Sequence, residues 1–133
     1  MVQRQLPKPK ELLELMQFKK PDLDARRRRL QAALTAGTRP DDSYLTPLIE
    51  RCAVEPDFYV RDMLTWAITR HDHTRAVDLL LPELGSVFPQ ARSQALHSLS
   101  KIRDRRAWPA IATALLRDTE PEVAKAAWRT AAG

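Results

Sequence analysis

The chain has 133 residues, enough for one domain or one short array of repeats. Hydrophobic residues make up 44% and charged residues 29%, so the chain can bury a core and stay soluble, and its 3 glycines favour helices over a β-rich fold. No apolar run reaches the roughly 20 residues of a membrane span, and no signal peptide is visible. Cys52, the only cysteine, cannot form an internal disulfide, so we expect a cytoplasmic protein.

The net charge of +5 is carried by the first part of the chain. Residues 1–37 hold nine Lys/Arg and four Asp/Glu, whereas the remainder is neutral. Attraction to a polyanion is therefore expected mainly from the N-terminal helices.

The N-terminal segment predicts a flexible lead-in over residues 1–8 and a helical hairpin over residues 9–37. Pro21 separates the two helices. Asp22 suits the N-cap of the second helix, and Gly37 suits its C-terminal cap. This hairpin matches none of the repeats that follow, so it is interpreted as a capping hairpin.

A run of four arginines lies in that second helix: Arg26, Arg27, Arg28 and Arg29. The apolar stripe of the helix is predicted to contain Leu23, Leu30, Ala33 and Leu34. Arg27 falls on this stripe by its spacing, and the other three arginines cover the remaining faces. The run is either a solvated surface whose side-chain stems cover apolar area, or a basic patch that contacts nucleic acid or an acidic protein.

One pattern recurs three times along the rest of the chain. Phe58–Arg70 is apolar at helical spacing, and the same outline returns from Pro89 and from Pro121. Aligning Val60, Ala91 and Val123 gives steps of 31 and 32 residues. Repetition at this period indicates stacked helical hairpins.

The three predicted hairpins occupy residues 42–133. Their helices are expected at about 42–54 and 57–70, at 74–87 and 89–102, and at 105–117 and 121–132. Pro47, Pro82 and Pro109 fall inside the first helix of each hairpin, which predicts that these helices are bent.

The repeats resemble short bacterial HEAT repeats. The third unit matches through Pro109, Ile111, Leu115, Asp118, Pro121, Val123 and Ala127. The first unit supplies the Val60-Arg61 pair, and the second supplies Ala91-Arg92. The resemblance implies an all-α fold, a right-handed α-solenoid of three HEAT-like hairpins preceded by the capping hairpin. It also implies contacts between arginines and inter-helix-turn aspartates, which should hold unevenly, because Ala124 replaces one arginine and residues 85–88 lack an aspartate.

The resemblance further implies that the second helices line the concave side of the array. Equivalent positions then form rows of exposed side chains, in which large aromatic residues and arginine favour a binding patch. The candidate partner-binding residues are Tyr59, Asp62, Trp66, Arg70, His97, Lys101, Lys125 and Arg129. Three interpretations of Trp66 stay open: packing between repeats, contact with a protein or peptide, and contact with nucleic acid.

Residues that could carry chemistry are few. His71-Asp72-His73 has too few ligands nearby for a zinc site and is interpreted as a turn in which Asp72 caps the next helix. Cys52 is expected to be an inert buried thiol. We expect no metal site, no cofactor and no catalytic residue.

The sequence therefore favours a non-catalytic scaffold that binds a partner protein or peptide on the face formed by the second helices. The alternative is a nucleic-acid-binding module, remotely an alkylated-base DNA glycosylase relative, because Asp62 and Trp66 share one helix face. The apolar C-terminal repeat also predicts some self-association.

Overall fold

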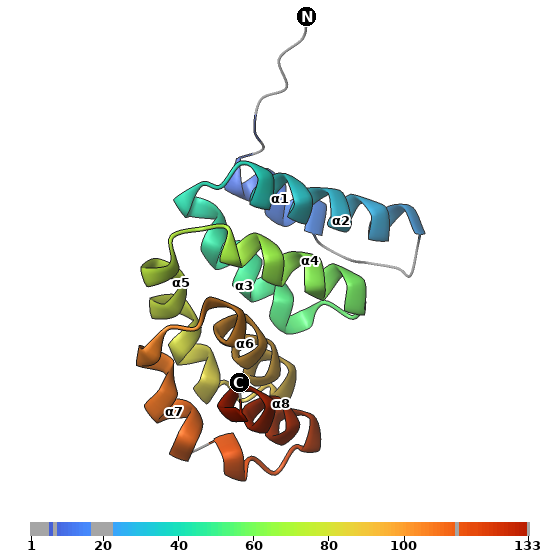
Figure 1. Ribbon diagram of the computed structural model, residues 1–133. Coiled ribbons are helices and arrows are strands. Elements are labelled where there is room, and N and C mark those ends of the chain that lie inside the picture. Colours follow the sequence, from blue (N-terminus) through green and yellow to red (C-terminus); the bar gives the residue numbers. More distant parts are fainter. Residues whose placement is uncertain (1–5, 7, 17–22, 114, 133) are drawn as a thin grey trace, which may run out of the picture.

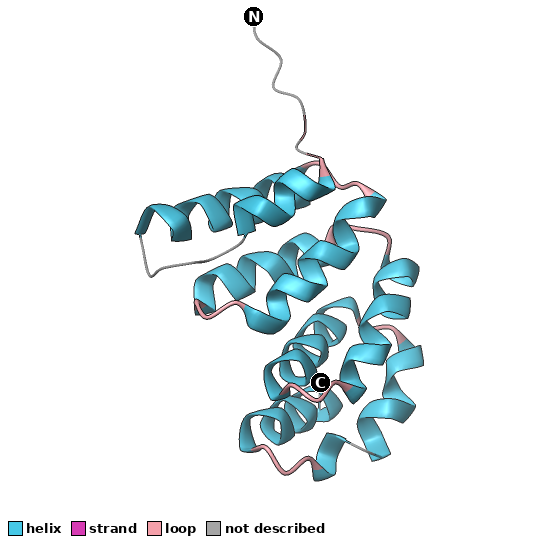
Figure 2. Ribbon diagram, turned by 180° about the vertical axis from the view of Figure 1, so that it is seen from behind, coloured by secondary structure: helices cyan, strands magenta, loops and turns pink. Residues whose placement is uncertain are grey.

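The computed structural model describes residues 6, 8–16, 23–113 and 115–132. Over this part of the chain it contains α-helices and short 3-10 helices and no strand (Figures 1 and 2). The α-helices are α1 (Pro9–Met16), α2 (Leu23–Thr38), α3 (Leu45–Val54), α4 (Phe58–Thr69), α5 (His73–Leu80), α6 (Pro89–Ile102), α7 (Trp108–Thr113) and α8 (Pro121–Ala132). The 3-10 helices are η1 (Asp42–Tyr44), η2 (Leu81–Gly85), η3 (Arg105–Ala107) and η4 (Leu115–Arg117).

The helices stack as hairpins into an all-α solenoid, which confirms the predicted fold class. The second helices α2, α4, α6 and α8 form one layer, in which each packs on the next (Figure 1). The first helices α1, α3, α5 and α7 flank this layer. Because equivalent helices are neighbours, residues about 31 positions apart in the chain come together in space.

The layer of second helices is held by small and aliphatic residues at helical spacing. Their buried positions repeat as Val60, Leu64 and Ile68 in α4, as Ala91, Ala95 and Leu99 in α6, and as Val123 and Ala127 in α8. Alanines at facing positions let the helix axes approach closely, and the aliphatic residues fill the remaining space. These residues form the core faces of α4, α6 and α8.

Two of the three prolines of the first helices lie near a helix start rather than in a helix interior. Pro47 and Pro109 lie in the first turns of α3 and α7, where the missing N–H has no helical acceptor to lose. Pro82 lies in η2, which continues α5 as a 3-10 helix. Each of these three helices is thus continued by a 3-10 segment at one or both ends.

Gly37 does not cap α2, contrary to the prediction. The helix continues to Thr38, and Gly37 is buried within it. A Cβ atom at this position would lie 2.2 Å from Cζ3 of Trp66, and the carbonyl oxygen of Gly37 accepts a hydrogen bond of 3.2 Å from Nε of Arg70. Because Gly37 has no side chain, α2 and α4 can approach each other closely at this position.

The buried side of α2 also differs from the predicted stripe. Leu23 and Leu34 are 72% and 41% exposed, and Arg27 is exposed as well. The buried residues of α2 are Arg29, Ala32, Ala33, Ala36 and Gly37. The buried face of α2 is rotated relative to the predicted stripe. Arg29 pairs with a buried acidic residue, and the side of the helix that carries Arg29 therefore faces inward.

Candidate partner-binding surface

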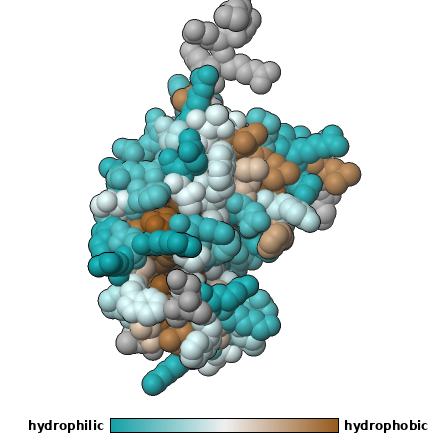
Figure 3. Space-filling model, viewed as in Figure 1, coloured by the Kyte–Doolittle hydropathy of each residue, from teal (hydrophilic) through white to brown (hydrophobic). Residues whose placement is uncertain are grey.

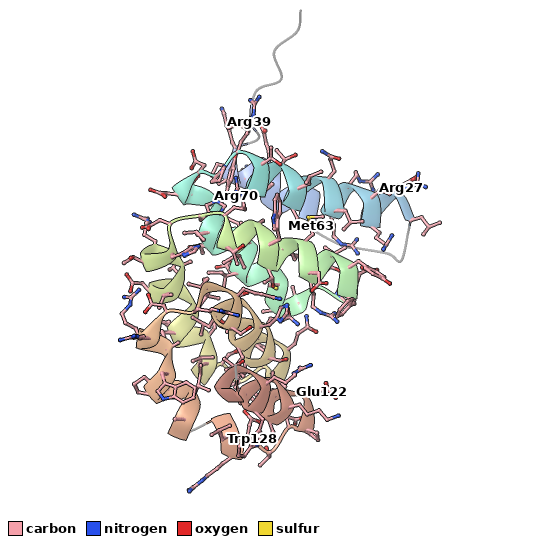
Figure 4. The ribbon with its side chains drawn as sticks, in the orientation of Figure 1. Arg27, Arg39, Met63, Arg70, Glu122 and Trp128 are labelled. Carbon is pink, nitrogen blue, oxygen red and sulfur yellow. The ribbon has the colours of Figure 1, made fainter. Side chains whose placement is uncertain are left out.

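A hollow of about 730 Å³ lies along α6 between α4 and α8. We call it the α6 groove. It is lined by Phe58, Arg61, Asp62, Pro89, Gln90, Ser93, Gln94, His97, Ser100, Lys101, Glu120, Glu122, Val123, Ala126, Arg129 and Thr130. Figure 4 looks onto this layer of helices and labels Met63 and Arg70 on α4 and Glu122 on α8.

The groove contains half of the predicted partner-binding residues. The residues that line it are Asp62, His97, Lys101 and Arg129, whereas Tyr59, Trp66, Arg70 and Lys125 lie outside it. The predicted rows of side chains across α4, α6 and α8 therefore lie partly inside the α6 groove and partly outside it.

Asp62 and His97 join α4 to α6 inside the groove, with 3.6 Å between Oδ1 and Nε2. Partial burial lowers the pKa of His97 below its ordinary value of 6.5, and the nearby cations Lys101 and Arg129 act in the same direction. The Asp62 carboxylate opposes them.

Charges are separated along the groove. Glu120 and Glu122 at the start of α8 place acids at one end, where Arg61 of α4 also lines the groove, and Asp62 lies further along it beside His97. Lys101 in the last turn of α6 and Arg129 in the last turn of α8 place cations at the other end. Figure 3 shows a mixed surface on this side of the molecule rather than one broad apolar sheet.

The predicted site residues outside the groove on α4 mostly contact α2. Trp66, 38% exposed, packs against Gly37, and Arg70 donates to the Gly37 carbonyl oxygen. The Arg26 guanidinium lies 5.6 Å from the ring centroid of Tyr59. These side chains stabilise the joint between α2 and α4, whereas Lys125 pairs with Glu122 at 4.0 Å on α8.

The four consecutive arginines do not form one exposed basic patch. Arg29 is 2% exposed and donates to both carboxylate oxygens of Glu55, at 2.6 and 3.2 Å. Arg26 pairs with Asp57 at 2.8 Å. Arg27 and Arg28 are the exposed members, because the run winds around the helix and turns Arg26 and Arg29 toward the α3–α4 turn.

An arginine–acid contact recurs along the array. Arg92 in α6 donates to Asp118 at 2.8 and 3.1 Å, and these hydrogen bonds lower the pKa of the Asp118 carboxyl. The Arg29–Glu55 and Arg92–Asp118 pairs have the same separation of 26 residues. Arg29, Arg61 and Arg92 are spaced by 32 and 31 residues. Helix α2 therefore contacts the turn of the following hairpin in the same way as α6 does.

Arg61 lacks the acid that the other two arginines have. Its Nη1 donates to the carbonyl oxygens of Glu55 and Pro56 at 2.8 and 2.9 Å, but its Nε is buried and has no hydrogen-bond partner among the described residues. The inter-helix turn of the middle repeat offers Ser86 instead of an acid. The prediction that these contacts hold unevenly is confirmed.

Ser86 occupies the same structural place as Glu55 and Asp118. The side chain of each accepts a hydrogen bond from the backbone N–H two residues later, at 3.1 Å for Ser86 and 2.9 Å for the two acids. The Ser86 carbonyl oxygen accepts from Nη1 of Arg92, as that of Glu55 accepts from Arg61. The middle turn thus keeps the backbone geometry and lacks the charge.

Asp62 and Trp66, which suggested a glycosylase, face different helices. The Asp62 carboxylate lies beside His97 of α6, and the Trp66 ring packs against Gly37 of α2. The two side chains therefore do not converge on one pocket as an acid and an aromatic of a base-excising site would.

The histidines and the cysteine have structural roles. Nδ1 of buried His71 bonds the Ala67 carbonyl oxygen at 2.7 Å, and its Nε2 accepts from the Asp41 N–H at 3.4 Å. Asp72 stands at the N-cap of α5, but its side chain makes no capping hydrogen bond, so that part of the prediction is wrong. Cys52 is buried, as predicted, and burial raises the pKa of its thiol to about 12, which disfavours the reactive thiolate.

No cluster of three or more His, Cys, Asp or Glu side chains able to hold a metal ion occurs within the described ranges. Within the same ranges, every helix is too short or too polar to cross a bilayer.

Comparison with known proteins identifies the repeats. A family model described as HEAT repeats matches residues 45–132, which is most of the chain. No curated protein matches the sequence. The chain belongs to the HEAT-repeat family.

Proposed function

We propose that the protein is a non-catalytic interaction module that holds a partner protein or peptide in the α6 groove. HEAT repeats are generally scaffolds for protein contacts, and the observation that points to this groove is its size and lining. It has a volume of about 730 Å³, and residues of the three second helices α4, α6 and α8 rather than closing loops form most of its walls. This shape suits an extended segment.

The charges of the groove give this segment a direction. A basic residue is complementary to Glu120 and Glu122 at the start of α8, and an acidic residue is complementary to Lys101 and Arg129 at the ends of α6 and α8. Complementary charges fix the register of a bound segment and speed its association. Between them, the small side chains Ser93 and Ala126 leave room for the partner's backbone.

Nucleic acid is the less favoured partner. Arg26 and Arg29 are engaged with Asp57 and Glu55, and the groove contains acids as well as cations. Both features lower the positive potential that phosphate binding requires. Titration with DNA and RNA at low and raised salt tests this alternative, which predicts binding that falls steeply with salt.

Self-association through the C-terminal repeat is a further part of the proposal. Trp128 on α8 is 60% exposed, and Figure 4 shows it at the end of the array. Large exposed apolar residues at an array end favour contact with another surface. Sedimentation should show association that Trp128→Arg removes, and a strict monomer at high concentration would contradict it.

The test of the groove is selection of peptides from a random display library, followed by affinity measurements on two variants. Ser93→Arg fills the groove, whereas Thr74→Arg adds the same side chain on the exposed surface of α5. We expect selected peptides to lose at least about tenfold in affinity for Ser93→Arg and to keep their affinity for Thr74→Arg. Equal affinity for both variants would contradict the proposal.

A further inference from the structure

We propose that the middle joint of the array, formed by Phe58, Arg61 and the turn Ser86–Phe88, binds a carboxylate side chain of the partner together with an apolar neighbour of that side chain. This inference deepens the proposed function and rests on it, because Phe58 and Arg61 line the α6 groove. Three observations meet at this joint.

The first observation is the missing acid. Arg29 and Arg92 each donate Nε to an acid of the following turn, at 2.6 and 2.8 Å. Nε of Arg61 is buried without a hydrogen-bond partner in the described part of the chain, and the equivalent turn residue is Ser86. A buried N–H of a charged group without an acceptor is unfavourable, because it has lost its hydrogen bonds to water. A carboxylate arriving from outside would remove this cost.

The second observation is the uncapped start of α6. Asp57 caps α4 by accepting from the Val60 N–H at 3.0 Å. The corresponding residue at α6 is Phe88, which provides no side-chain cap. The first backbone N–H groups of a helix attract a carboxylate through their hydrogen-bonding capacity and the helix dipole. The Ser86–Phe88 turn therefore lacks both an acid to pair with Arg61 and an acid to cap the start of α6.

The third observation is exposed apolar area around the gap. Phe58, Val87 and Phe88 are 59%, 82% and 62% exposed. The places of Val87 and Phe88 are taken by Pro56 and Asp57 in the preceding turn, and by Thr119 and Glu120 in the following turn.

The middle turn thus has two large apolar residues where the neighbouring turns have Pro56, Asp57, Thr119 and Glu120, and it has no acid. Phe58 lies beside Arg61, with 6.0 Å between the guanidinium carbon and the ring centroid, and exposed apolar residues beside an arginine are typical of an interface centre.

These features define the occupant. The equivalent places in the array hold the single carboxylates of Glu55 and Asp118, so the gap fits Asp or Glu of a partner peptide. Asp62, Glu120 and Glu122 line the same groove and disfavour a polyanion. An aliphatic or aromatic residue adjacent to the acid would cover Phe58 and Phe88. The predicted recognition element is therefore an acidic residue beside a large apolar one.

Ser86→Asp tests the inference, because it supplies an acid from the protein itself. Ser86 is equivalent to Asp118, which pairs with Arg92 in the following turn. The control is Gly85→Asp, which adds the same charge one residue earlier, where a Cβ atom meets nothing within 4 Å. Random peptides displayed on phage are selected against the unmodified protein. Affinities of the enriched peptides are then measured for both variants, along with their thermal unfolding.

We expect enriched peptides to contain Asp or Glu beside a large apolar residue. Ser86→Asp should weaken them at least about tenfold and raise the melting temperature, whereas Gly85→Asp should do neither. Enriched peptides without an acid, or equal affinity for Ser86→Asp and Gly85→Asp, would overturn the inference and leave the groove proposal standing. Failure to enrich any peptide would overturn both.

Discussion

Arg29 and Glu55 form a buried ion pair that joins α2 to the α3–α4 turn. Nε of Arg29 lies 2.6 Å from Oε1 of Glu55, and the residues are 2% and 0% exposed. Glu55 also accepts from Arg51 at 3.1 Å and from the Asp57 N–H at 2.9 Å. Because its oxygens are satisfied by several donors, this carboxylate is the hub that fixes the N-terminal hairpin to the repeats.

Glu55→Gln should destabilise the fold by about 3–5 kcal/mol, because it leaves the Arg29 guanidinium buried without its counter-charge. The measurement is urea unfolding followed by circular dichroism. The double variant Arg29→Gln/Glu55→Gln should be less destabilised than the sum of the single variants. A loss below about 1 kcal/mol for Glu55→Gln would show that the pair is not the hub described here.

The contact of Gly37 with Trp66 gives a second prediction. Gly37→Ala should destabilise by about 1–3 kcal/mol, although alanine is the better helix former, because its Cβ would lie 2.2 Å from the Trp66 ring. Adding Trp66→Leu should recover much of this loss. Gly85→Ala is the matched control and should change stability by less than about 0.5 kcal/mol. Thermal unfolding of the four proteins provides the check, and a neutral Gly37→Ala would contradict the packing.

The repeats could be predicted from the sequence, because prolines and small apolar residues at a period near 31 mark both the hairpins and their buried faces. The register of α2 was missed. An arginine counts as a surface residue in any hydrophobicity pattern, and only a buried acid 26 residues away turns Arg29 inward. The role of Gly37 was also hidden, because it depends on the Trp66 ring of another repeat.

The candidate site shows a similar limit. The rows of equivalent residues could be predicted, but not that Trp66 and Arg70 would turn to α2 while Asp62 turned to His97. A side chain on α4 can turn toward α2 or toward α6, depending on the space beside each of these helices. The spacing of residues along the sequence does not contain this information.

Arg103 ends α6 in a left-handed conformation, with φ of 60°. Residues with a Cβ atom are strained there and glycine is not. Arg103→Gly should therefore raise stability by about 0.5–1 kcal/mol, whereas Arg103→Val should lower it. Lys101→Gly, placed inside the same helix, should cost about 1 kcal/mol. Melting temperatures of the three variants check this, and a destabilised Arg103→Gly would contradict the assignment.

His97 predicts a pH dependence of stability. Its folded pKa is below the ordinary value of 6.5, chiefly through burial, so the unfolded chain binds more protons as the pH falls below 6.5. Stability should therefore decrease from pH 6.5 downward until the pH passes the folded pKa, and His97→Gln should lack this contribution.

Titration of the imidazole signal by NMR measures the same pKa. Asp62→Asn should lower it further, because the carboxylate favours the charged imidazole, and Lys101→Ala should raise it. A pKa above 6.5 in the unmodified protein would contradict the described surroundings of His97.

The most direct test of the α6 groove as the binding surface is to record backbone amide shifts by NMR while a display-selected peptide is added. The account predicts that the perturbed amides cluster on the groove side of α4, α6 and α8, around Arg61, Ser93 and His97. Perturbations confined to the first helices α3 and α5, with α6 unchanged, would contradict it.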